Sequence, residues 1–212
     1  MDPRHALAEG VVAISDEIDT DLLFESYSFG IFPWPHNERD PILWFCPNRR
    51  AVLDFKDLHV SRSLNKFRRK SGWRISFDKA FDLVVEQCSL TVRPDQTGTW
   101  ITQRMKSAYS QFHHLGYAHS VECWDGNDLV GGLYGVYVAG VFSAESMFYL
   151  KPNASKLCIL ALIEKLQNSG MQWLDIQMLT PHMGAMGGRE VSRKDFLERL
   201  DQAKRNATPI LF

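Results

Sequence analysis

The sequence predicts a mixed α/β fold of the α+β kind, in which helices flank a mixed sheet and a small N-terminal domain is added. From His59 onward, stretches with the alternation of a strand and stretches with the spacing of a helix follow one another, whereas residues 1–58 are rich in aromatic residues and proline. With 212 residues, 45% of them apolar and 23% charged, the chain can bury a proper core. We expect a small domain at residues 1–58 and a main domain at residues 59–212.

The N-terminal part contains one helix signal and two short apolar runs. Thr20 can cap a helix that Gly30 can end. Prolines then separate two apolar runs between residues 30 and 55, which is typical of short strands joined by turns.

The next part of the chain predicts three helices and one strand. Each helix has a candidate capping side chain before an apolar stripe, and the run WRISF has strand character. The expected caps are Ser61 for a helix to about Lys70, Asp78 for a helix over residues 79–89, and Thr102 for a helix that stops at Gly116.

The second half of the chain predicts four strands and two helices. Three β-rich runs are joined by Gly126-Asn127 and Ala139-Gly140, which is the turn chemistry of an antiparallel meander. The elements that follow are a helix capped by Asn153 or Ser155 and ended by Ser169-Gly170, a strand over residues 173–178, and a helix from Ser192 to about Arg205.

The order of these elements matches the core of the N-acetyltransferase superfold. In that fold, the strand before the long helix and the strand after it splay apart, and we expect the same here by likeness of fold.

The strand WLDIQM carries two polar residues in an otherwise apolar run. Side chains alternate along a strand, so Asp175 and Gln177 share one face. An ionised carboxylate in apolar surroundings is costly unless it is paired or hydrogen bonded. This face must therefore meet water, a partner or a substrate.

Composition excludes several classes of protein. A net charge of −1 predicts no overall attraction to nucleic acid or membranes, so such binding needs a local patch. Four scattered cysteines without a C-x-x-C pair predict neither a zinc site nor a disulfide framework. The N-terminus lacks signal-peptide character and no apolar stretch is long enough to cross a bilayer, which favours a cytoplasmic protein without membrane contact.

Several short motifs occur in an order that is specific to one family. The chain resembles the leucyl/phenylalanyl-tRNA-protein transferases from about Tyr27 to Leu200. Each motif alone is weak, but their fixed order makes coincidence improbable. The motifs are GIFPW, GTWIT, GYAHSVECW, LVGGLYGV, ESMF, NASK and LDIQML.

The resemblance implies an aminoacyltransferase that needs no cofactor or metal and acts as a monomer. It would move leucine or phenylalanine, and also methionine, from aminoacyl-tRNA to the α-amine of proteins that begin with arginine or lysine, marking them for N-degron proteolysis. About a tenth of an α-amine of pKa near 7.7 to 8.0 is neutral at pH 7, so positioning can carry much of the rate.

The resemblance also implies the catalytic residues. Asp175 and Gln177 would hold or deprotonate the acceptor amine, and Glu145 would bind the aminoacyl group. An exposed aspartate of pKa near 3.9 is a poor base for an amine. Either burial raises the pKa of Asp175 so that it can act as a base, or its role is electrostatic. The pattern alone favours a structural aspartate at a strand end for Asp175, and it fits an edge-strand acid facing water equally well for Glu145.

The implied substrate-binding residues are apolar or aromatic. Leu133, Ala144 and Leu162 stand where the family pattern has methionine, glycine and phenylalanine, so the preferred amino acid stays open. From the pattern alone these residues are core, and the tryptophans brace the small domain rather than stack on a base. The implied set is Leu133, Phe142, Ala144, Met147 and Leu162 for the amino acid and Trp34 and Trp100 for the terminal adenosine.

Residues 61–77 contain six basic residues and no acid. On a helix, an apolar stripe of Val60, Leu64 and Phe67 anchors a basic face, which suits the backbone of RNA. A merely solvated helix face is the alternative. The expected tRNA-binding residues are Arg62, Lys66, Arg69 and Lys70.

Two other functions fit parts of the sequence. A coenzyme-A-dependent N-acetyltransferase would share the fold, but YLKPNASK stands where its pyrophosphate loop is expected. A non-catalytic RNA-binding or peptide-binding module would leave Asp175 and Gln177 without a task. His113, His114 and His119 have no partners at metal-ligand spacing, so we expect no metal there.

Overall fold

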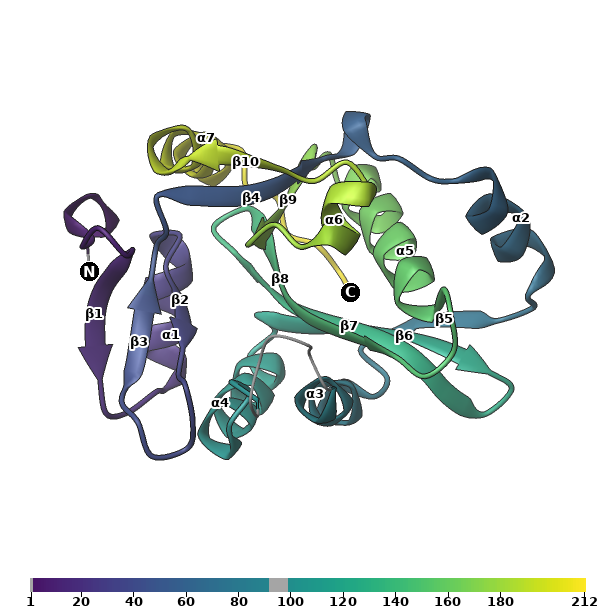
Figure 1. Ribbon diagram of the computed structural model, residues 1–212, viewed down its shortest axis with the longest axis horizontal. Helices are drawn as coiled ribbons and strands as arrows, with labels where there is room; N and C mark the ends of the chain where they lie inside the picture. The colour runs from purple at the N-terminus through teal and green to yellow at the C-terminus, as the bar shows by residue number, and fades with distance from the viewer. Residues whose placement is uncertain (1, 92–98) are drawn as a thin grey trace.

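The computed structural model describes residues 2–91 and 99–212. Helices surround a large mixed sheet, and a smaller sheet lies at one end (Figure 1). The seven-stranded sheet has the order β10 (Arg189–Ser192), β4 (Arg49–Asp54), β9 (Trp173–Gln177), β8 (Val141–Tyr149), β7 (Asp128–Val138), β6 (Ala118–Asp125) and β5 (Arg74–Phe77). The three-stranded sheet has the order β1 (Val11–Ser15), β3 (Ile42–Phe45) and β2 (Phe32–Trp34).

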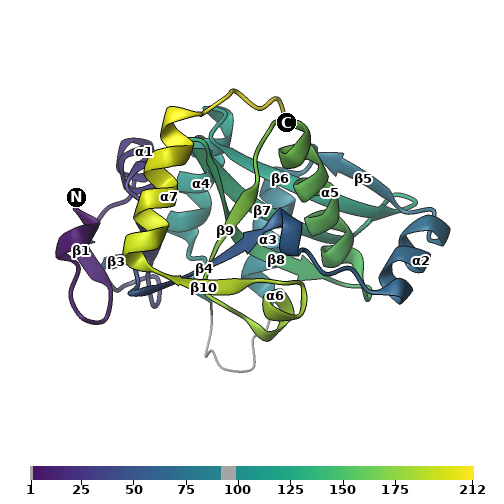
Figure 2. The same cartoon turned by 90° about the horizontal axis from the view of Figure 1, so that it is seen from above.

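Helices cover both faces of the large sheet. In Figure 1, α5 lies on one face and α3 and α4 on the other, while α2 and the small sheet stand at opposite ends of the molecule, as Figure 2 also shows. This arrangement confirms the mixed α/β fold. The helices are α1 (Thr20–Ser28), α2 (Arg62–Lys70), α3 (Phe81–Leu90), α4 (Gln103–His114), α5 (Ala154–Asn168), α6 (Pro181–Ala185) and α7 (Arg193–Arg205), with 3₁₀ turns at Pro3–His5 and Phe55–Asp57.

Among the described residues, no helix is both long and apolar enough to cross a bilayer. The main elements expected from residue 59 onward are all present, whereas β1, α6 and β10 were missed because each is short and has little periodicity.

Strand β4 differs from the expected domain division. We placed residues 1–58 in the small domain, but β4 pairs antiparallel with both β9 and β10 in the large sheet. The pairing partners lie 119 or more positions further along the chain, so no local pattern could reveal them. The small sheet therefore ends at β3 (Figure 1).

The expected caps Ser61 and Thr102 are confirmed, and Ser192, the expected start of α7, caps its helix in the same way. In each, the side-chain oxygen accepts the backbone N–H three residues later, which satisfies a donor that the helix leaves free. The caps are Ser61 on Leu64 at 3.2 Å, Thr102 on Met105 at 3.3 Å and Ser192 on Asp195 at 3.1 Å.

The expected caps Thr20 and Asp78 were wrong. Asp19, not Thr20, caps α1, since its carboxylate accepts the amide of Leu22 at 2.8 Å. Asp78 does not cap α3, because it instead accepts the amide of Ser120 at 2.7 Å. The start of α3 faces a carboxylate from another strand, Glu122, which lies 3.4 Å from the amide of Ala80 and 3.5 Å from that of Lys79.

The start of α5 is unusual. Asn153 precedes the helix in the left-handed conformation, with φ of +77°, and its side chain makes no capping hydrogen bond. The left-handed conformation is one that asparagine tolerates better than most residues. Neither Asn153 nor Ser155 is therefore the side-chain cap that we expected.

The strands on either side of α5 separate as expected. β8 and β9 run parallel and pair at one position, Ser143 with Asp175. Beyond it toward their carboxyl ends, the ladder stops and the strands leave a space between them. Side chains that follow this position on either strand can therefore reach an open pocket.

Candidate active site

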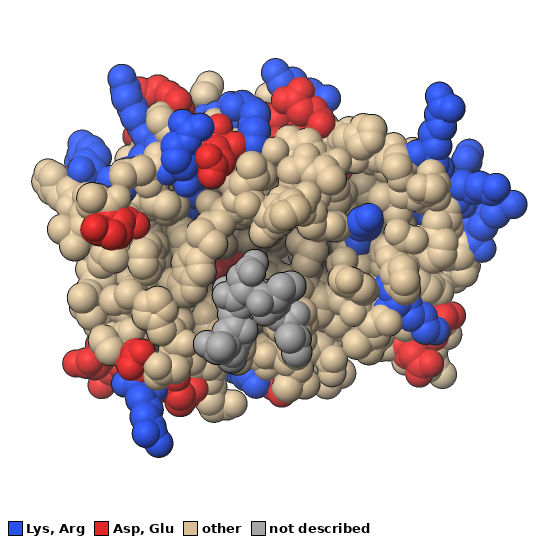
Figure 3. Space-filling view, in the orientation of Figure 1, with Lys and Arg blue, Asp and Glu red and all other residues tan. Residues whose placement is uncertain are grey.

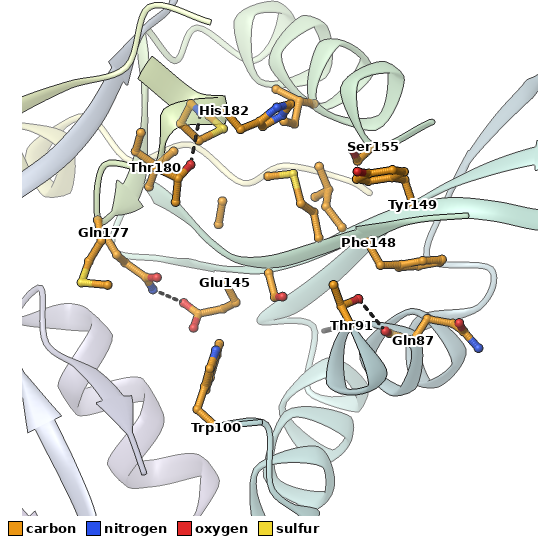
Figure 4. A pocket seen from close by; sticks show the side chains of 18 of the residues that line it. Gln87, Thr91, Trp100, Glu145, Phe148, Tyr149, Ser155, Gln177, Thr180 and His182 are labelled. Carbon is orange, nitrogen blue, oxygen red and sulfur yellow. Dashed lines mark hydrogen bonds between the residues drawn. The ribbon is translucent and has the colours of Figure 1, made fainter. Parts of the chain in front are cut away.

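A pocket of about 930 Å³ lies at the separated ends of β8 and β9. Its volume is typical of a site for a small molecule or a cofactor. It is bounded by β2 of the small sheet, the end of α3, Trp100 before α4, β8, α5, β9 and α6, so it joins elements from the whole chain (Figure 4).

Glu145 is the carboxylate of this pocket. It projects from β8, and its Oε1 accepts a hydrogen bond from the Gln177 side-chain amide at 2.5 Å (Figure 4). Its Oε2 accepts a hydrogen bond from the Tyr109 hydroxyl at 3.1 Å. The Tyr27 and Tyr109 hydroxyls lie 2.7 Å apart. A chain of polar groups thus links α1 and α4 to the pocket and fixes the orientation of this carboxylate.

The surroundings of Glu145 perturb its acidity. Burial raises its pKa to about 7, with a further contribution from the negative charge of Asp175, against the lowering effect of the hydrogen bonds that it accepts. A carboxyl group that titrates near neutral pH can accept a proton in a reaction at pH 7.

Gln177 reaches the same pocket in a strained conformation. Its φ is +56°, in the left-handed region that non-glycine residues rarely occupy and that often accompanies function. Its backbone amide donates to Asp175 at 3.0 Å. Because its side-chain NH₂ donates to Glu145, its carbonyl oxygen is left as an acceptor on the pocket side.

Asp175 does not line the pocket, in contrast to our expectation that it would open into the cleft with Gln177. It is 1% exposed and forms a two-pronged ion pair with Arg50, at 2.8 and 2.7 Å. Ser143 and the amide of Gln177 donate to the same carboxylate at 2.9 and 3.0 Å. The left-handed backbone at Gln177 ends the strand alternation, so the two side chains separate.

Arg50 is itself enclosed. Its guanidinium carbon lies 4.6 Å from the ring centre of Phe32 and 4.5 Å from that of Phe196, and the side chain is 1% exposed. Aromatic faces attract a cation, so the two rings favour the charged form. Strand β4, the small sheet and α7 together bury this ion pair.

The predicted apolar residues mostly surround the pocket. Leu133, Ala144, Met147 and Leu162 line it, but Phe142 does not. Phe142 precedes Ser143, the position at which β8 pairs with β9, and its ring centre lies 5.6 Å from that of Phe212. It is therefore a core residue at this position.

Trp34 and Trp100 both line the pocket and are half-buried. Trp34 also packs against Phe32 and Phe45, with ring centres 6.0 and 5.8 Å apart. The two interpretations of these tryptophans are compatible, because each has one side on the core and another on the cavity.

The basic helix α2 lies far from the pocket, at the end of the molecule opposite the small sheet (Figure 1). Leu64 is buried beneath it as expected. Arg68 is held by Glu164 through two hydrogen bonds of 2.6 Å. The four predicted residues are exposed and contribute to the cluster of blue side chains at the right of Figure 3; they are Arg62, Lys66, Arg69 and Lys70.

Several pocket groups and their supports were not predicted. Arg50, Tyr27 and Tyr109 were missed because their partners are distant in sequence. Ser155 and His182 line the pocket but carry no local pattern that would separate them from ordinary helix residues.

The fold also brings His113 and His119, which we had set aside, close to Asp78, which we had expected to cap α3. One ligand-type atom each from Asp78, His113 and His119 lies within 4.8 Å of the others, contrary to the expectation from their spacing. His119 bonds Asp78 at 2.8 Å and the carbonyl of Gly116 at 3.1 Å, and His113 bonds the carbonyl of Ala118 at 2.7 Å. These bonds already engage the nitrogen atoms that face the cluster.

Comparison with known proteins identifies relatives over nearly the whole chain. Residues 52–201 match the family model described as leucyl/phenylalanyl-tRNA protein transferase, and residues 16–48 match the model of its N-terminal domain. The gap between the two matches falls where the small sheet gives way to β4.

Individual relatives agree with this match. The leucyl/phenylalanyl-tRNA–protein transferase of Anaeromyxobacter dehalogenans strain 2CP-C is 43% identical over 98% of this chain and 88% of its own length. That of Maridesulfovibrio salexigens is 44% identical over 95% and 84%, and that of Shewanella baltica strain OS155 is 42% identical over 96% and 86%.

Proposed function

Since the chain belongs to the leucyl/phenylalanyl-tRNA protein transferase family, it is an aminoacyltransferase that moves an amino acid from tRNA to a protein, and we propose how its pocket does so. The observation that carries the proposal is the Glu145–Gln177 pair, which lies between an apolar cavity and two tryptophans. The donors are leucyl- and phenylalanyl-tRNA, with methionine also accepted.

The acceptor is the α-amine of a protein that begins with arginine or lysine. Among the described residues that line the pocket, Glu145 is the one that carries a carboxylate, so it is the group that attracts a cationic chain end. Arg50 neutralises Asp175, which therefore contributes little to this attraction. The enzyme acts as a monomer in the cytoplasm, where charged tRNA is found, and its products are marked for N-degron proteolysis.

The reaction forms one bond and breaks another. The neutral amine nitrogen attacks the ester carbonyl carbon, and the carbon–oxygen bond to the ribose breaks. Glu145 accepts the proton that the nitrogen loses and returns it to the ribose oxygen, so atoms and charge balance. Gln177 accepts a hydrogen bond from the amine through its free carbonyl oxygen and holds it in line.

Asp175 acts through Gln177 and does not touch the substrate. Its carboxylate already accepts four hydrogen bonds, from Arg50 twice, from Ser143 and from the amide of Gln177. Such a carboxylate has no lone pair left for a proton from the amine. Its role is to hold the strained backbone of Gln177.

The remaining pocket residues bind the donor. Leu133, Ala144, Met147 and Leu162 enclose the side chain of the amino acid, and Trp34 and Trp100 contact the terminal adenosine. An apolar pocket separates side chains that differ by one methylene by only about 1–3 kcal/mol, which supports some tolerance among apolar amino acids.

One assay tests the function directly. The protein is incubated with a peptide that begins with arginine and with either labelled phenylalanyl-tRNA or acetyl-coenzyme A. We expect label to transfer from the tRNA and no acetyl transfer. Acetylation of the peptide would instead identify a coenzyme-A-dependent enzyme, and binding of tRNA without any transfer would identify a binding module.

The exposed face of α2 is expected to hold the phosphate backbone of the tRNA. Changing Arg62, Lys66 and Arg69 to glutamate should weaken tRNA binding whatever its sequence. Three lost phosphate contacts should also reduce the slope of log affinity against log salt by about two to three.

A matched triple variant on α7, with Lys194, Lys204 and Arg205 changed to glutamate, controls for net charge. Binding is measured by filter retention or fluorescence anisotropy at several salt concentrations. An α2 variant that keeps the parent slope, or that behaves like the α7 variant, would identify a solvated helix face.

A further inference from the structure

One wall of the pocket carries polar groups that the transfer chemistry does not use. His182 and Ser155 lie on α6 and α5, on the side away from Trp100 (Figure 4). The Nε2 atom of His182 is fully buried and has no hydrogen-bond partner. Ser155 is 4% exposed and lines the pocket, and no described residue bonds its hydroxyl. Buried polar atoms are nearly always satisfied, so the unpaired Nε2 of His182 points to a missing ligand beside this hydroxyl.

The first turn of α5 adds donors beside them. The amides of Ala154 and Leu157 donate to the carbonyls of Lys151 and Asn153, at 3.2 and 3.0 Å. Within the described chain, the amides of Ser155 and Lys156 have no such acceptor, as expected for the first turn of a helix. The start of this 15-residue helix is thus free of any capping side chain and carries partial positive charge.

Lys156 follows Ser155 in the first turn of α5 and adds a positive charge close to this wall, although it is not one of the residues that line the pocket. It forms no ion pair with any acid in the part of the chain that the structure describes. Its charge is felt at His182, whose pKa is lowered by burial and by this lysine. A neutral imidazole can place its proton on Nε2 and act as a donor. The wall therefore offers donors without a carboxylate.

We propose that Ser155, Lys156, His182 and the first turn of α5 bind a phosphate group, namely the phosphodiester on the 5′ side of the terminal adenosine of the donor. This inference rests on the proposed function, because the donor is what brings such a group into the pocket. The amino acid occupies the cavity that Leu162 lines one to two turns further along α5. Helix starts bind phosphate through free amides and the helix dipole.

With this site, each part of the donor has its own binding surface on the protein. Helix α2 contacts the tRNA body, the tryptophans contact the terminal base, and this wall fixes the backbone between them. A phosphate held at one end and an amino acid held at the other would set the position of the ester relative to Glu145.

The test compares two small donors that differ by one phosphodiester. Phenylalanyl-adenosine has none, and the phenylalanyl ester of cytidylyl-adenosine has one. We expect the parent to have the higher kcat/KM for the dinucleotide. In the double variant Lys156→Met with His182→Leu, the ratio of the two kcat/KM values should fall about tenfold or more, since hydrogen bonds to charged groups are the strong ones. Ser155→Ala should lower the ratio in the same direction.

Trp100→Ala is the matched control, because loss of a stacked base should weaken both donors by a similar factor and leave their ratio near that of the parent. A ratio in the double variant that equals that of the parent would overturn the proposal. If both kcat/KM values had also fallen, by the same factor, the wall would be structural or would bind the acceptor. His182→Gln, which keeps a donor, should restore part of the ratio.

Binding of unreactive nucleotides separates this proposal from the proposed function. The parent should bind adenosine 5′-monophosphate more tightly than adenosine, and the double variant should lose that difference. If no donor reacts with the parent, the transferase assignment fails while this comparison still tests the phosphate site. Equal affinity of the parent for the two nucleotides would overturn the site, and inhibition by inorganic phosphate alone would identify a site for the free anion only.

Discussion

Replacing Arg50 by methionine is expected to lower the free energy of unfolding by about 3–5 kcal/mol, the usual cost of removing one partner of a buried ion pair. The Asp175 carboxylate would then remain buried at 1% exposure with two of its four hydrogen bonds lost. The substitution also removes the cation between the rings of Phe32 and Phe196. Chemical denaturation of the variant and the parent measures the difference.

The neighbouring arginine offers a matched control. Arg49 lies on the same strand, but its pair with Glu190 is exposed and has a distance of 3.4 Å, so Arg49→Met should change stability by less than about 1 kcal/mol. A double variant, Arg50→Met with Asp175→Asn, should recover part of the loss because no unpaired charge remains. If Arg50→Met is no more harmful than Arg49→Met, the buried pair is not what joins β4 to β9.

The same pair bears on the reaction. Asp175→Asn keeps the size of the side chain but weakens its hold on Arg50 and on the Gln177 amide. We expect a lower kcat with little change in the binding of charged tRNA, as for a residue that positions another. If the variant also lost affinity for charged tRNA, Asp175 would instead act in donor binding.

Glu145→Gln is expected to lower the rate of transfer by about 10²–10⁴, the range usual for a general base. Glutamine can still bond Tyr109 and Gln177 but cannot take the proton of the attacking amine. Single-turnover transfer from phenylalanyl-tRNA to a peptide that begins with arginine measures the chemical step. A variant that reacts at the parent rate would remove Glu145 from the proton transfer.

The pH dependence of the rate gives a second measure of Glu145. Its pKa is raised to about 7, so the reactive carboxylate form increases as pH rises through 7. The acceptor amine, of pKa about 7.7–8.0, also reacts in its deprotonated form. Below about pH 6, where both groups are mostly protonated, the parent rate should therefore rise about a hundredfold per pH unit, and the Glu145→Gln rate only about tenfold, since one ionisation remains. Equal slopes would contradict the assignment.

Much of the fold follows from local patterns. The hairpins of β6, β7 and β8 are encoded by turn residues such as Ala139 and Gly140, both of positive φ. Ser61, Thr102 and Ser192 cap their helices through bonds three residues away. Such interactions join near neighbours in the chain, which is why the sequence alone predicts them.

The order of the motifs identified the family, and the resemblance to that family determined which residues we assigned to the site. Glu145, Gln177 and most of the apolar set reach the pocket. Phe142 does not, because likeness names a position without stating which way its side chain points. The alternation that grouped Asp175 with Gln177 failed at one residue, whose left-handed backbone turns the second side chain away from the first.

By itself, then, the sequence determined the succession of helices and strands, the basic face of α2 and the family of the chain. Only the tertiary structure decided that Asp175 is ion-paired with Arg50, which lies 125 positions earlier, and that Glu145 is the carboxylate with a pKa of about 7. It also decided that Ser155 and His182 line one pocket, where the buried Nε2 of His182 has no hydrogen-bond partner. Periodicity records which residues are buried, whereas the charge state and the task of a buried group depend on neighbours that only folding brings within hydrogen-bond distance.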